Sequence, residues 1–412
     1  MPPLTPRPEP PSVLLLGIAS SLSPFGVTIA VPILAGIATT FAASAGAAQF
    51  VISAYLLGLA LAQPFNGFLC DRLGRRPVLL GGFGVFVAAS VAAAYATQLE
   101  LLIACRFLQA VGVSVGTVAS RAVVRDTRDA AGAAEALAYI AAAMGFAPVV
   151  APILGGWLGA SWGYQTVFWI TALMGVVTLA AIYLLLPETL HADSARPRWS
   201  QWMRNYRALF TSGPFIGYTL VFGFIQGCFF AFLAIGATLF EQRFGIGARQ
   251  FGLWWGLMAI SYVLGAVASG RLTRRIGPER VMRYSVLAAL AAGWLAVAWV
   301  SLRGVTVPGV LVPMGLLMLI AGSVTPGALA GAVNLFPRMA GTASGLSSAA
   351  GIVIGGLFTV IAGYSYDGDY RDITYLIAGC ATLTAASWYL VHRHPTATGE
   401  PQTPAANRPR EP

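Results

Sequence analysis

The chain has 412 residues, of which 57% are hydrophobic and only 10% charged, and its mean hydropathy is +0.74. A soluble domain carries about 25% charged residues, so the composition excludes an ordinary soluble protein and favours one with the bilayer as its solvent. The net charge of +10 comes from 25 Arg, with no Lys, against 15 acidic residues. These arginines are scattered between apolar stretches, which argues against a nucleic-acid partner.

Apolar segments recur at about the 20 residues that a helix needs to cross the hydrocarbon layer. They do not alternate as barrel strands would, so each is predicted to be a transmembrane helix. Twelve are predicted, over 12–37, 47–69, 78–98, 99–121, 135–160, 164–186, 214–240, 250–270, 281–302, 305–330, 342–366 and 372–391. The fold class is therefore all-α membrane protein.

The arginines also predict the orientation. With the N-terminus inside, the inner segments hold 20 arginines and the outer segments four, while Arg106 lies within a span. Positive charge accumulates on the cytoplasmic side of membrane proteins. Both termini are therefore expected in the cytoplasm, with the chain in a plasma membrane.

The connection 187–213 is the longest between two spans and separates the first six from the last six. We interpret residues 12–186 and 214–391 as two six-helix bundles joined by a cytoplasmic linker, with residues 1–11 and 392–412 as tails. The two bundles resemble each other: Gly67, Arg72 and Gly74 recur as Gly270, Arg275 and Gly277, at a constant offset of 203. Two parallel six-span repeats are typical of transporters with a site near the midplane, between the halves.

The loop after the second span carries the most specific motif, which runs from Gly67 to Pro77. Gly74 fits a tight turn between bulky neighbours. Asp71 stands among Arg72, Arg75 and Arg76, so one carboxylate faces three guanidinium groups. This pattern favours a breakable ion-pair latch; a loop that only sets topology would explain the arginines but not Asp71 and the glycines.

This loop resembles the signature of the major facilitator superfamily. Within that superfamily, the chain resembles the bicyclomycin/chloramphenicol-resistance (Bcr/CflA) branch of drug exporters over nearly all of residues 12–391. The likeness extends to the segments 49–63, 106–109, 121–126, 186–189, 224–232 and 340–345. It implies two pseudo-symmetric six-helix bundles and transport of small molecules by alternating access.

Arg106 is the ionisable residue that lies well inside a span, and such residues are functional by default. The alternative is an Arg that binds carbonyl groups of neighbouring helices. Gln109 follows at i+3 and faces the same side. In the resembling family this Arg-x-x-Gln pair is tied to proton coupling, so both residues are candidates for substrate binding or coupling.

Glycine and proline interrupt the fifth span at Gly145, Pro148, Pro152, Gly155 and Gly156. Internal prolines remove helix hydrogen bonds, and small residues allow close helix contact. The spacing resembles a fifth-helix motif associated with exporters, and we interpret it as a flexing element.

The first span departs from the family. The segment Pro24–Pro32 resembles a segment of the family that carries an Asp at the position of Thr28. Because this chain has Thr28 instead, no carboxylate remains inside any predicted span. Arg does not exchange protons in practice, which puts proton coupling in doubt. A cavity with Arg106 and no acid would disfavour organic cations. We therefore expect neutral or anionic amphipathic substrates.

The wall of the substrate cavity is expected to be apolar and aromatic with a few polar groups. The candidates are Thr28, Tyr55, Gln226, Phe229, Phe230, Trp254, Trp255 and Tyr262. The four cysteines have no metal-ligand spacing, and no ATP-binding loop or hydrolase motif is present. We expect no metal, no cofactor and no enzymatic activity.

The sequence thus predicts a monomeric secondary transporter of a bacterial inner membrane. It is expected to export small amphipathic compounds or drugs, with the proton as a possible coupling ion. Two alternatives remain open: an uptake permease or uniporter for an organic anion, and a membrane sensor that does not transport.

Overall fold

The computed structural model describes residues 10–190, 199–336 and 340–393, and every regular element in these ranges is a helix. The first half contains α1 (Val13–Thr28), the 3₁₀ helix η1 (Val31–Ile33), α2 (Leu34–Thr40), α3 (Ala45–Leu73), α4 (Arg75–Ala94), α5 (Leu99–Thr127), α6 (Ala130–Trp162) and α7 (Tyr164–Leu185). The helix α8 (Trp199–Phe210) leads into α9 (Gly213–Phe244), α10 (Ala248–Ile276), α11 (Pro278–Arg303), α12 (Val307–Asn334), α13 (Ala340–Ser365) and α14 (Arg371–Arg393).

The twelve predicted spans are confirmed: 12 helices are long and apolar enough to cross a membrane. The first of them is interrupted, because α1, η1 and α2 follow one another between Val13 and Thr40. Pro32 lies at this break, where its missing N–H cannot continue the helical ladder. The fourth span was predicted to end at residue 121, but α5 runs on to Thr127 because a helix can continue past the charged edge of the membrane.

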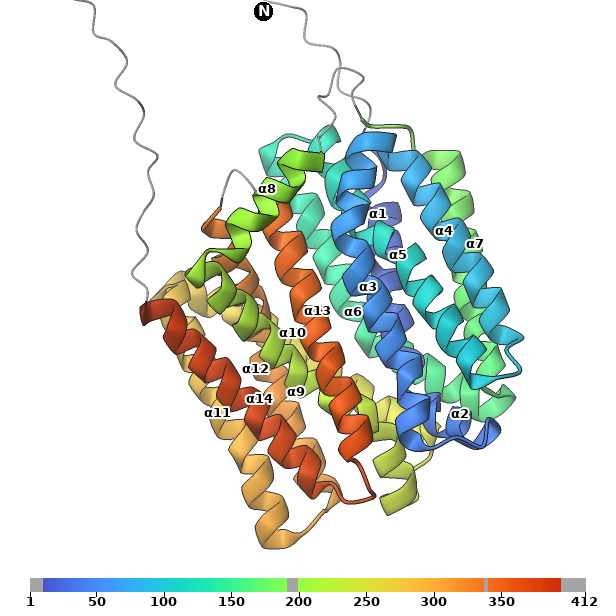
Figure 1. Cartoon of the computed structure of the whole chain (residues 1–412), viewed down its shortest axis with the longest axis vertical. Coiled ribbons are helices and arrows are strands. Elements are labelled where there is room, and N and C mark those ends of the chain that lie inside the picture. Colours follow the sequence, from blue (N-terminus) through green and yellow to red (C-terminus); the bar gives the residue numbers. More distant parts are fainter. Residues whose placement is uncertain (1–9, 191–198, 337–339, 394–412) are drawn as a thin grey trace, which may run out of the picture.

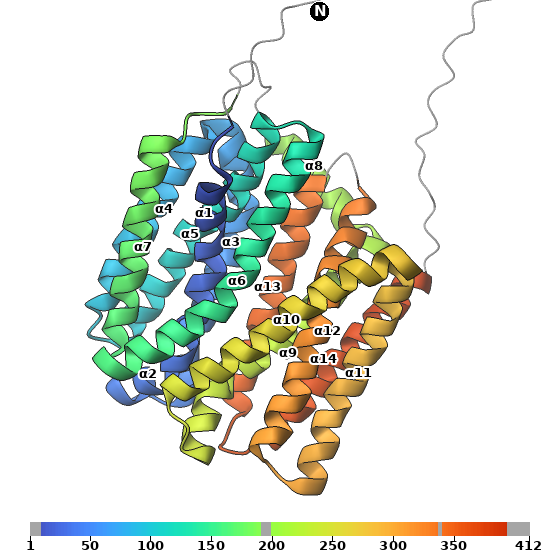
Figure 2. The same cartoon turned by 180° about the vertical axis from the view of Figure 1, so that it is seen from behind.

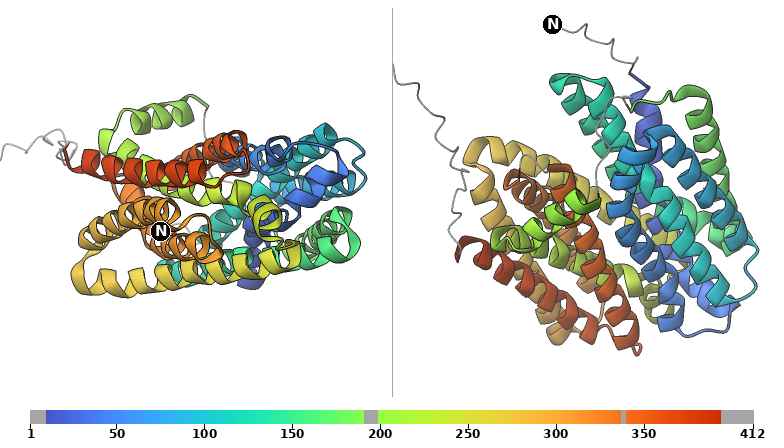
Figure 3. Two further views of the ribbon diagram at one scale, coloured as in Figure 1. Left: turned by 90° about the horizontal axis from the view of Figure 1, so that it is seen from below. Right: turned by 45° about the horizontal axis from the view of Figure 1, so that its top comes forward.

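The spans form two bundles, which we call the N half (α1–α7) and the C half (α9–α14) (Figures 1 and 2). The two bundles stand side by side when the molecule is turned by 90° (Figure 3). Successive spans run in opposite directions, so the start of α1 and the end of α14 lie at the same end of the molecule (Figure 1). We call this the terminus end and the opposite one the far end.

The two halves contact each other through α6 with α10 and through α3 with α13. A Cβ on Gly46 of α3 would lie 3.2 Å from the carbonyl oxygen of Gly363 on α13, and the rings of Phe50 and Tyr364 meet edge to face at 6.1 Å. These residues lie near the start of α3 and the end of α13, which is the far end. The molecule is therefore closed at the far end.

The helix α8, which the sequence analysis did not predict, lies within the expected linker at the terminus end (Figure 1). Its Leu209 is buried in a small apolar cluster with Phe215 of α9, Ala332 of α12 and Leu346 of α13. The linker is thus packed against the C half over its last turns. Most of the two predicted tails, 1–11 and 392–412, lies outside the described residues.

Candidate functional site

Arg106 lies on α5 with no exposed surface, and its guanidinium group donates to three oxygens. Nη2 donates to the carbonyl of Gly26 on α1 at 2.8 Å, Nε to the carbonyl of Val51 on α3 at 3.2 Å, and Nη1 to Oε1 of Gln109 at 3.0 Å. The predicted i+3 pairing of Arg106 with Gln109 is thus present. The three bonds tie α1, α3 and α5 together.

Aromatic rings cover the remaining faces of this guanidinium group. The Arg106 Cζ lies 4.0 Å from the ring centroid of Tyr55 and 5.9 Å from that of Phe168. The Tyr55 hydroxyl donates to the carbonyl of Ser23, and it occupies the space that a Cβ on Gly26 would fill. A buried cation is stabilised here by carbonyl dipoles and π faces.

Gln109 extends this polar cluster to α4. Its Nε2 donates to the hydroxyl of Ser90 at 2.8 Å, and that hydroxyl donates to the carbonyl of Phe86. Both side chains are fully buried. Arg106, Gln109 and Tyr55 therefore form a closed network inside the N half, with no surface open to a ligand in this conformation. This arrangement matches the alternative in which Arg106 binds carbonyl groups of neighbouring helices.

Thr28 ends α1 at the break in the first span, and it is 3% exposed. Its hydroxyl donates to the carbonyl of Pro24 at 2.9 Å, so it is satisfied within its own helix. The acidic residues of the described spans all lie near a helix end. The middle of the described spans thus carries the charge of Arg106 without a carboxylate.

The predicted latch lies at the terminus end of the N half. Gly74 adopts φ 104° and ψ 155°, which permits the tight turn from α3 to α4. Arg75 forms ion pairs with Asp71 and with Asp126 of α5, both at 2.9 Å, and also donates to the carbonyl of Cys70. Among the described residues, Asp71 pairs with Arg75 but not with Arg72 or Arg76, and these ion pairs join helices of one half.

Glu188 follows α7 and lies in the segment 186–189, which the sequence analysis gave only as part of the resemblance. Its carboxylate accepts from the backbone N–H groups of Arg75 and Arg76 at 2.9 and 3.1 Å, so it caps the start of α4. Oε1 also accepts from the N–H groups of Thr189 and Leu190. No spacing rule connects positions 75, 126 and 188, so the sequence carried no signal for this cluster.

The fifth-span motif lies on α6, which stays helical through Pro148 and Pro152. A Cβ on Gly155 would overlap the carbonyl oxygen of Ile29, and one on Gly156 would overlap that of Ala248 on α10. A Cβ on Gly145 would meet nothing within 4 Å. Gly155 and Gly156 thus permit close packing of α6 against the first span and against the C half.

The aromatic residues that were predicted to line the substrate cavity lie on α9 and α10 of the C half, apart from Tyr55 on α3. Trp255 is fully buried, stacks on Phe232 at 5.8 Å and contacts Phe229 edge to face at 5.6 Å. Its indole N–H has no hydrogen-bond partner in the part of the chain that the structure describes. Phe230 is also buried and packs on Gly355 of α13, whereas Gln226 accepts a 3.5 Å hydrogen bond from Thr325 of α12.

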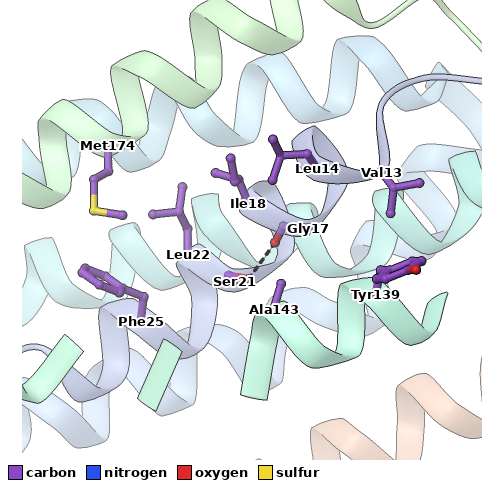
Figure 4. Close-up of a pocket in the computed structure, with 10 residues that line it drawn as sticks. All are labelled: Val13, Leu14, Gly17, Ile18, Ser21, Leu22, Phe25, Tyr139, Ala143 and Met174. Carbon is purple, nitrogen blue, oxygen red and sulfur yellow. Dashed lines mark hydrogen bonds between the residues drawn. The ribbon is translucent and has the colours of Figure 1, made fainter. Parts of the chain in front are cut away.

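An apolar groove of about 410 Å³ lies between α1, α6 and α7 (Figure 4). Leu14, Ile18 and Tyr139 line it and are 72%, 43% and 61% exposed. Ser21 also lines it, but its hydroxyl is bonded to the carbonyl of Gly17 at 2.7 Å. A ligand site needs convergent polar groups, so this groove has the character of a surface for hydrocarbon chains.

Two bundles of six spans, closed against each other at one end, define a membrane transporter of the alternating-access type. The sequence model of the Major Facilitator Superfamily matches residues 16–359, and the chain belongs to that superfamily. It is a multi-pass transporter of the bacterial inner membrane.

Its relatives include drug-resistance proteins. The chain is 30% identical to multidrug resistance protein D of Escherichia coli over 352 residues, which cover 85% of this chain and 86% of that protein. It is 30% identical to a chloramphenicol resistance protein of Pseudomonas aeruginosa, over 85% of this chain and 83% of that protein. It is 25% identical to a bicyclomycin resistance protein homologue of Haemophilus influenzae, over 92% of this chain and 95% of that protein.

Solved structures share the fold at lower identity. A D-xylose–proton symporter superposes with a TM-score of 0.73 at 14% identity, covering 92% of this chain and 96% of the other. A bacterial homologue of the human lysosomal transporter Spinster, in an inward-facing and occupied conformation, gives a TM-score of 0.73 at 15% identity, with the same coverage. These likenesses confirm the predicted fold class.

Proposed function

We propose that this protein exports small amphipathic drugs across the inner membrane by alternating access, with a single chain as the transport unit. The observation that carries the proposal is that the halves are closed against each other at the far end, through α6–α10 and α3–α13. The names of the drug-resistance relatives support the direction of transport.

The excess of arginine on the terminus side supports an orientation with both termini in the cytoplasm. In that orientation the far end faces the periplasm, and the closure at the far end supports assignment to an inward-facing state. An exporter takes up its substrate in this state.

The charge of the spans supports a substrate class. Arg106 is a full positive charge in a low-dielectric region, and the carboxylates of the described spans lie near helix ends. A positive potential disfavours cations. We therefore propose neutral or anionic amphipathic substrates, with the aromatic groups of α9 and α10 forming part of the path.

For proton-coupled antiport, the spans would need a group that gains and loses a proton. Three acidic groups, Asp71, Asp126 and Glu188, surround Arg75 at the terminus end. We propose that any proton coupling runs through this cluster, which is the latch extended by Asp126 and Glu188.

The test measures accumulation of matched neutral, anionic and cationic compounds in an efflux-deficient bacterium that expresses the chain, with and without a protonophore. We expect lower accumulation of neutral and anionic compounds, lost with the protonophore. Thr28→Asp should extend export to cations, and Thr39→Asp, at an exposed site on α2, should not. Export of cations by the unmodified chain would contradict the proposed substrate class.

The charge of the spans also favours a second function. A positive span interior without a carboxylate also suits an uptake permease or uniporter for an organic anion. In the accumulation assay, a permease would raise the level of anionic compounds, and the protonophore would leave this uptake unchanged. That result would replace the exporter proposal.

A further inference from the structure

The helix α8 differs from every span in its direction. It runs across the spans at the terminus end (Figure 1). When the molecule is seen from below, α8 lies outside α14, at the rim of the C half (Figure 3). Its 12 residues are too few to cross a bilayer. A helix in this position lies along the surface of the membrane and not through it.

Two features fix the level of α8 relative to the membrane. The helix ends at Phe210 and the next span, α9, begins at Gly213, so only two residues lie between them. An extended chain covers about 3.5 Å per residue, which keeps Phe210 close to the start of the span. Leu209 is also buried in the apolar cluster that α8 shares with α9, α12 and α13. The last turn of α8 is therefore held where α9 enters the membrane.

The apolar side chains of α8 point in two directions. Tyr206 and Leu209 are three residues apart and pack against the C half. Met203 and Phe210 are seven residues apart, which is two helical turns, so they share a neighbouring face. These two side chains are 48% and 57% exposed. Large apolar side chains that remain exposed beside a span suit hydrocarbon better than water.

The charge of α8 is positive on this exposed face. Arg207 lies four residues after Met203 and three before Phe210, so it borders the same stripe. It is exposed and forms no ion pair with any described residue. The helix contains a second arginine, Arg204, and no acidic residue. Arginine at a membrane surface lays its aliphatic stem on the apolar side and keeps its charge at the level of the phosphates.

We propose that α8 is an interfacial helix that binds an anionic phospholipid leaflet at the terminus end. Met203 and Phe210 enter the upper part of the acyl chains, and Arg207 contacts the headgroup phosphates. Charge complementarity selects an anionic leaflet, because each basic residue near such a surface is attracted to it. The proposal needs only that the spans lie in a membrane. It is therefore independent of the substrate and of the direction of transport.

The test measures the depth of spin labels on the full-length protein in nanodiscs of phosphatidylcholine, with and without phosphatidylglycerol. One label is attached at Met203→Cys, on the proposed membrane face, and the other at Ala208→Cys, an exposed position on the opposite side of α8. The four native cysteines are buried. Oxygen concentrates in hydrocarbon, whereas a nickel chelate stays in water. We expect the ratio of oxygen to nickel accessibility to be several-fold higher at Met203→Cys.

Two further variants test the charge in the Met203→Cys background. Phosphatidylglycerol should raise the accessibility ratio, by at most about fivefold for one basic residue near an anionic surface. Arg207→Gln should remove this rise. Arg283→Gln, at an exposed position near the start of α11, is the matched control and should preserve it. Equal ratios in the two lipid mixtures would overturn the proposal, and so would equal losses in the two arginine variants.

Two other outcomes would also overturn it. A label at Met203→Cys that is shielded from oxygen and from nickel would show that protein covers this face of α8. Equal and high nickel accessibility at both label positions would show that α8 lies in water. Transport is not measured in this test, so its failure would leave the proposed function unchanged.

Discussion

Gly156 on α6 packs directly against the backbone of Ala248 on α10, so any Cβ on Gly156 would overlap the carbonyl oxygen of Ala248. The contact is reciprocal, because a Cβ on Gly252 would overlap the carbonyl oxygen of Pro152. In both helices the two residues are one turn apart, so the crossing is nearly symmetric. This crossing joins the two halves toward the far end, and opening of that end has to separate it.

Gly156→Leu should therefore shift the protein away from the state closed at the far end. Overpacking of a tight contact costs about 1–3 kcal/mol, which is enough to invert a balanced two-state equilibrium. The measurement is the distance between spin labels at Thr40 and Gln242, which are exposed near the far ends of α2 and α9. We expect a longer distance in the variant.

Gly145→Leu is the matched control for this experiment, because it lies on the same helix and its Cβ would meet nothing within 4 Å. The four native cysteines are buried, which favours selective labelling of introduced ones. An unchanged label distance in Gly156→Leu, in a protein that remains folded, would show that the α6–α10 crossing does not hold the far end closed.

Glu188→Ala should destabilise the N half, because it leaves the first N–H groups of α4 and those of Thr189 and Leu190 without their acceptor. Loss of a helix cap costs about 0.5–2 kcal/mol. Thermal unfolding in detergent should show a lower Tm for Glu188→Ala. The Tm of Glu188→Gln should lie between those of Glu188→Ala and the unmodified protein. Glu135→Gln, at an exposed position of α6, is the control and should leave the Tm unchanged. Equal Tm values for Glu188→Ala and the unmodified protein would argue against a capping role.

The twelve spans were predictable because hydrocarbon imposes length and apolarity on every span. The helix α8 was not predicted, because its short segment is polar on one face and its burial depends partly on Ala332 and Leu346, which are distant in sequence. The C-terminal end of α5 was missed because the helix outlasts its apolar segment. Hydropathy stops at Arg121, whereas the helix continues to Thr127.

The candidate site was predictable only where partners are close in the sequence. Helical geometry places Arg106 and Gln109 on one face, and they are bonded. The other partners of Arg106 are carbonyl groups of Gly26 and Val51, which carry no side-chain signal. The same holds for Arg75, whose partner Asp71 is local but whose partner Asp126 comes from another span.

Arg75→Lys should weaken the N half although it preserves the charge. Three separate guanidinium nitrogens of Arg75 bind Asp71, Asp126 and the carbonyl of Cys70. A single ammonium group at the end of a flexible chain does not reproduce this fork. We expect Arg75→Lys to lower the Tm and to raise the proteolytic cleavage rate at the α3–α4 turn. Arg72→Lys, whose side chain lies over the Phe68 ring, should change neither value. A Tm for Arg75→Lys equal to that of Arg72→Lys would show that the three guanidinium contacts of Arg75 do not stabilise the N half.

The main effect of Arg106→Ala should be a lower stability of the N half. The substitution leaves the carbonyls of Gly26 and Val51 and the amide oxygen of Gln109 without a donor in a buried region. Each unpaired group costs about 1–3 kcal/mol, and the contact with Tyr55 is lost as well. Arg106→Lys should restore little of this stability, because Lys cannot bind three divergent acceptors at once.

The readouts are the Tm in detergent and the export rate in vesicles, with the exposed Arg371→Ala as a control. A lower Tm for both Arg106 variants, with export falling in proportion to the folded fraction, would assign Arg106 to the architecture of the N half. The opposite pattern is an unchanged Tm together with lost export. It would place Arg106 in substrate binding or coupling, because the fold would then survive without its hydrogen bonds.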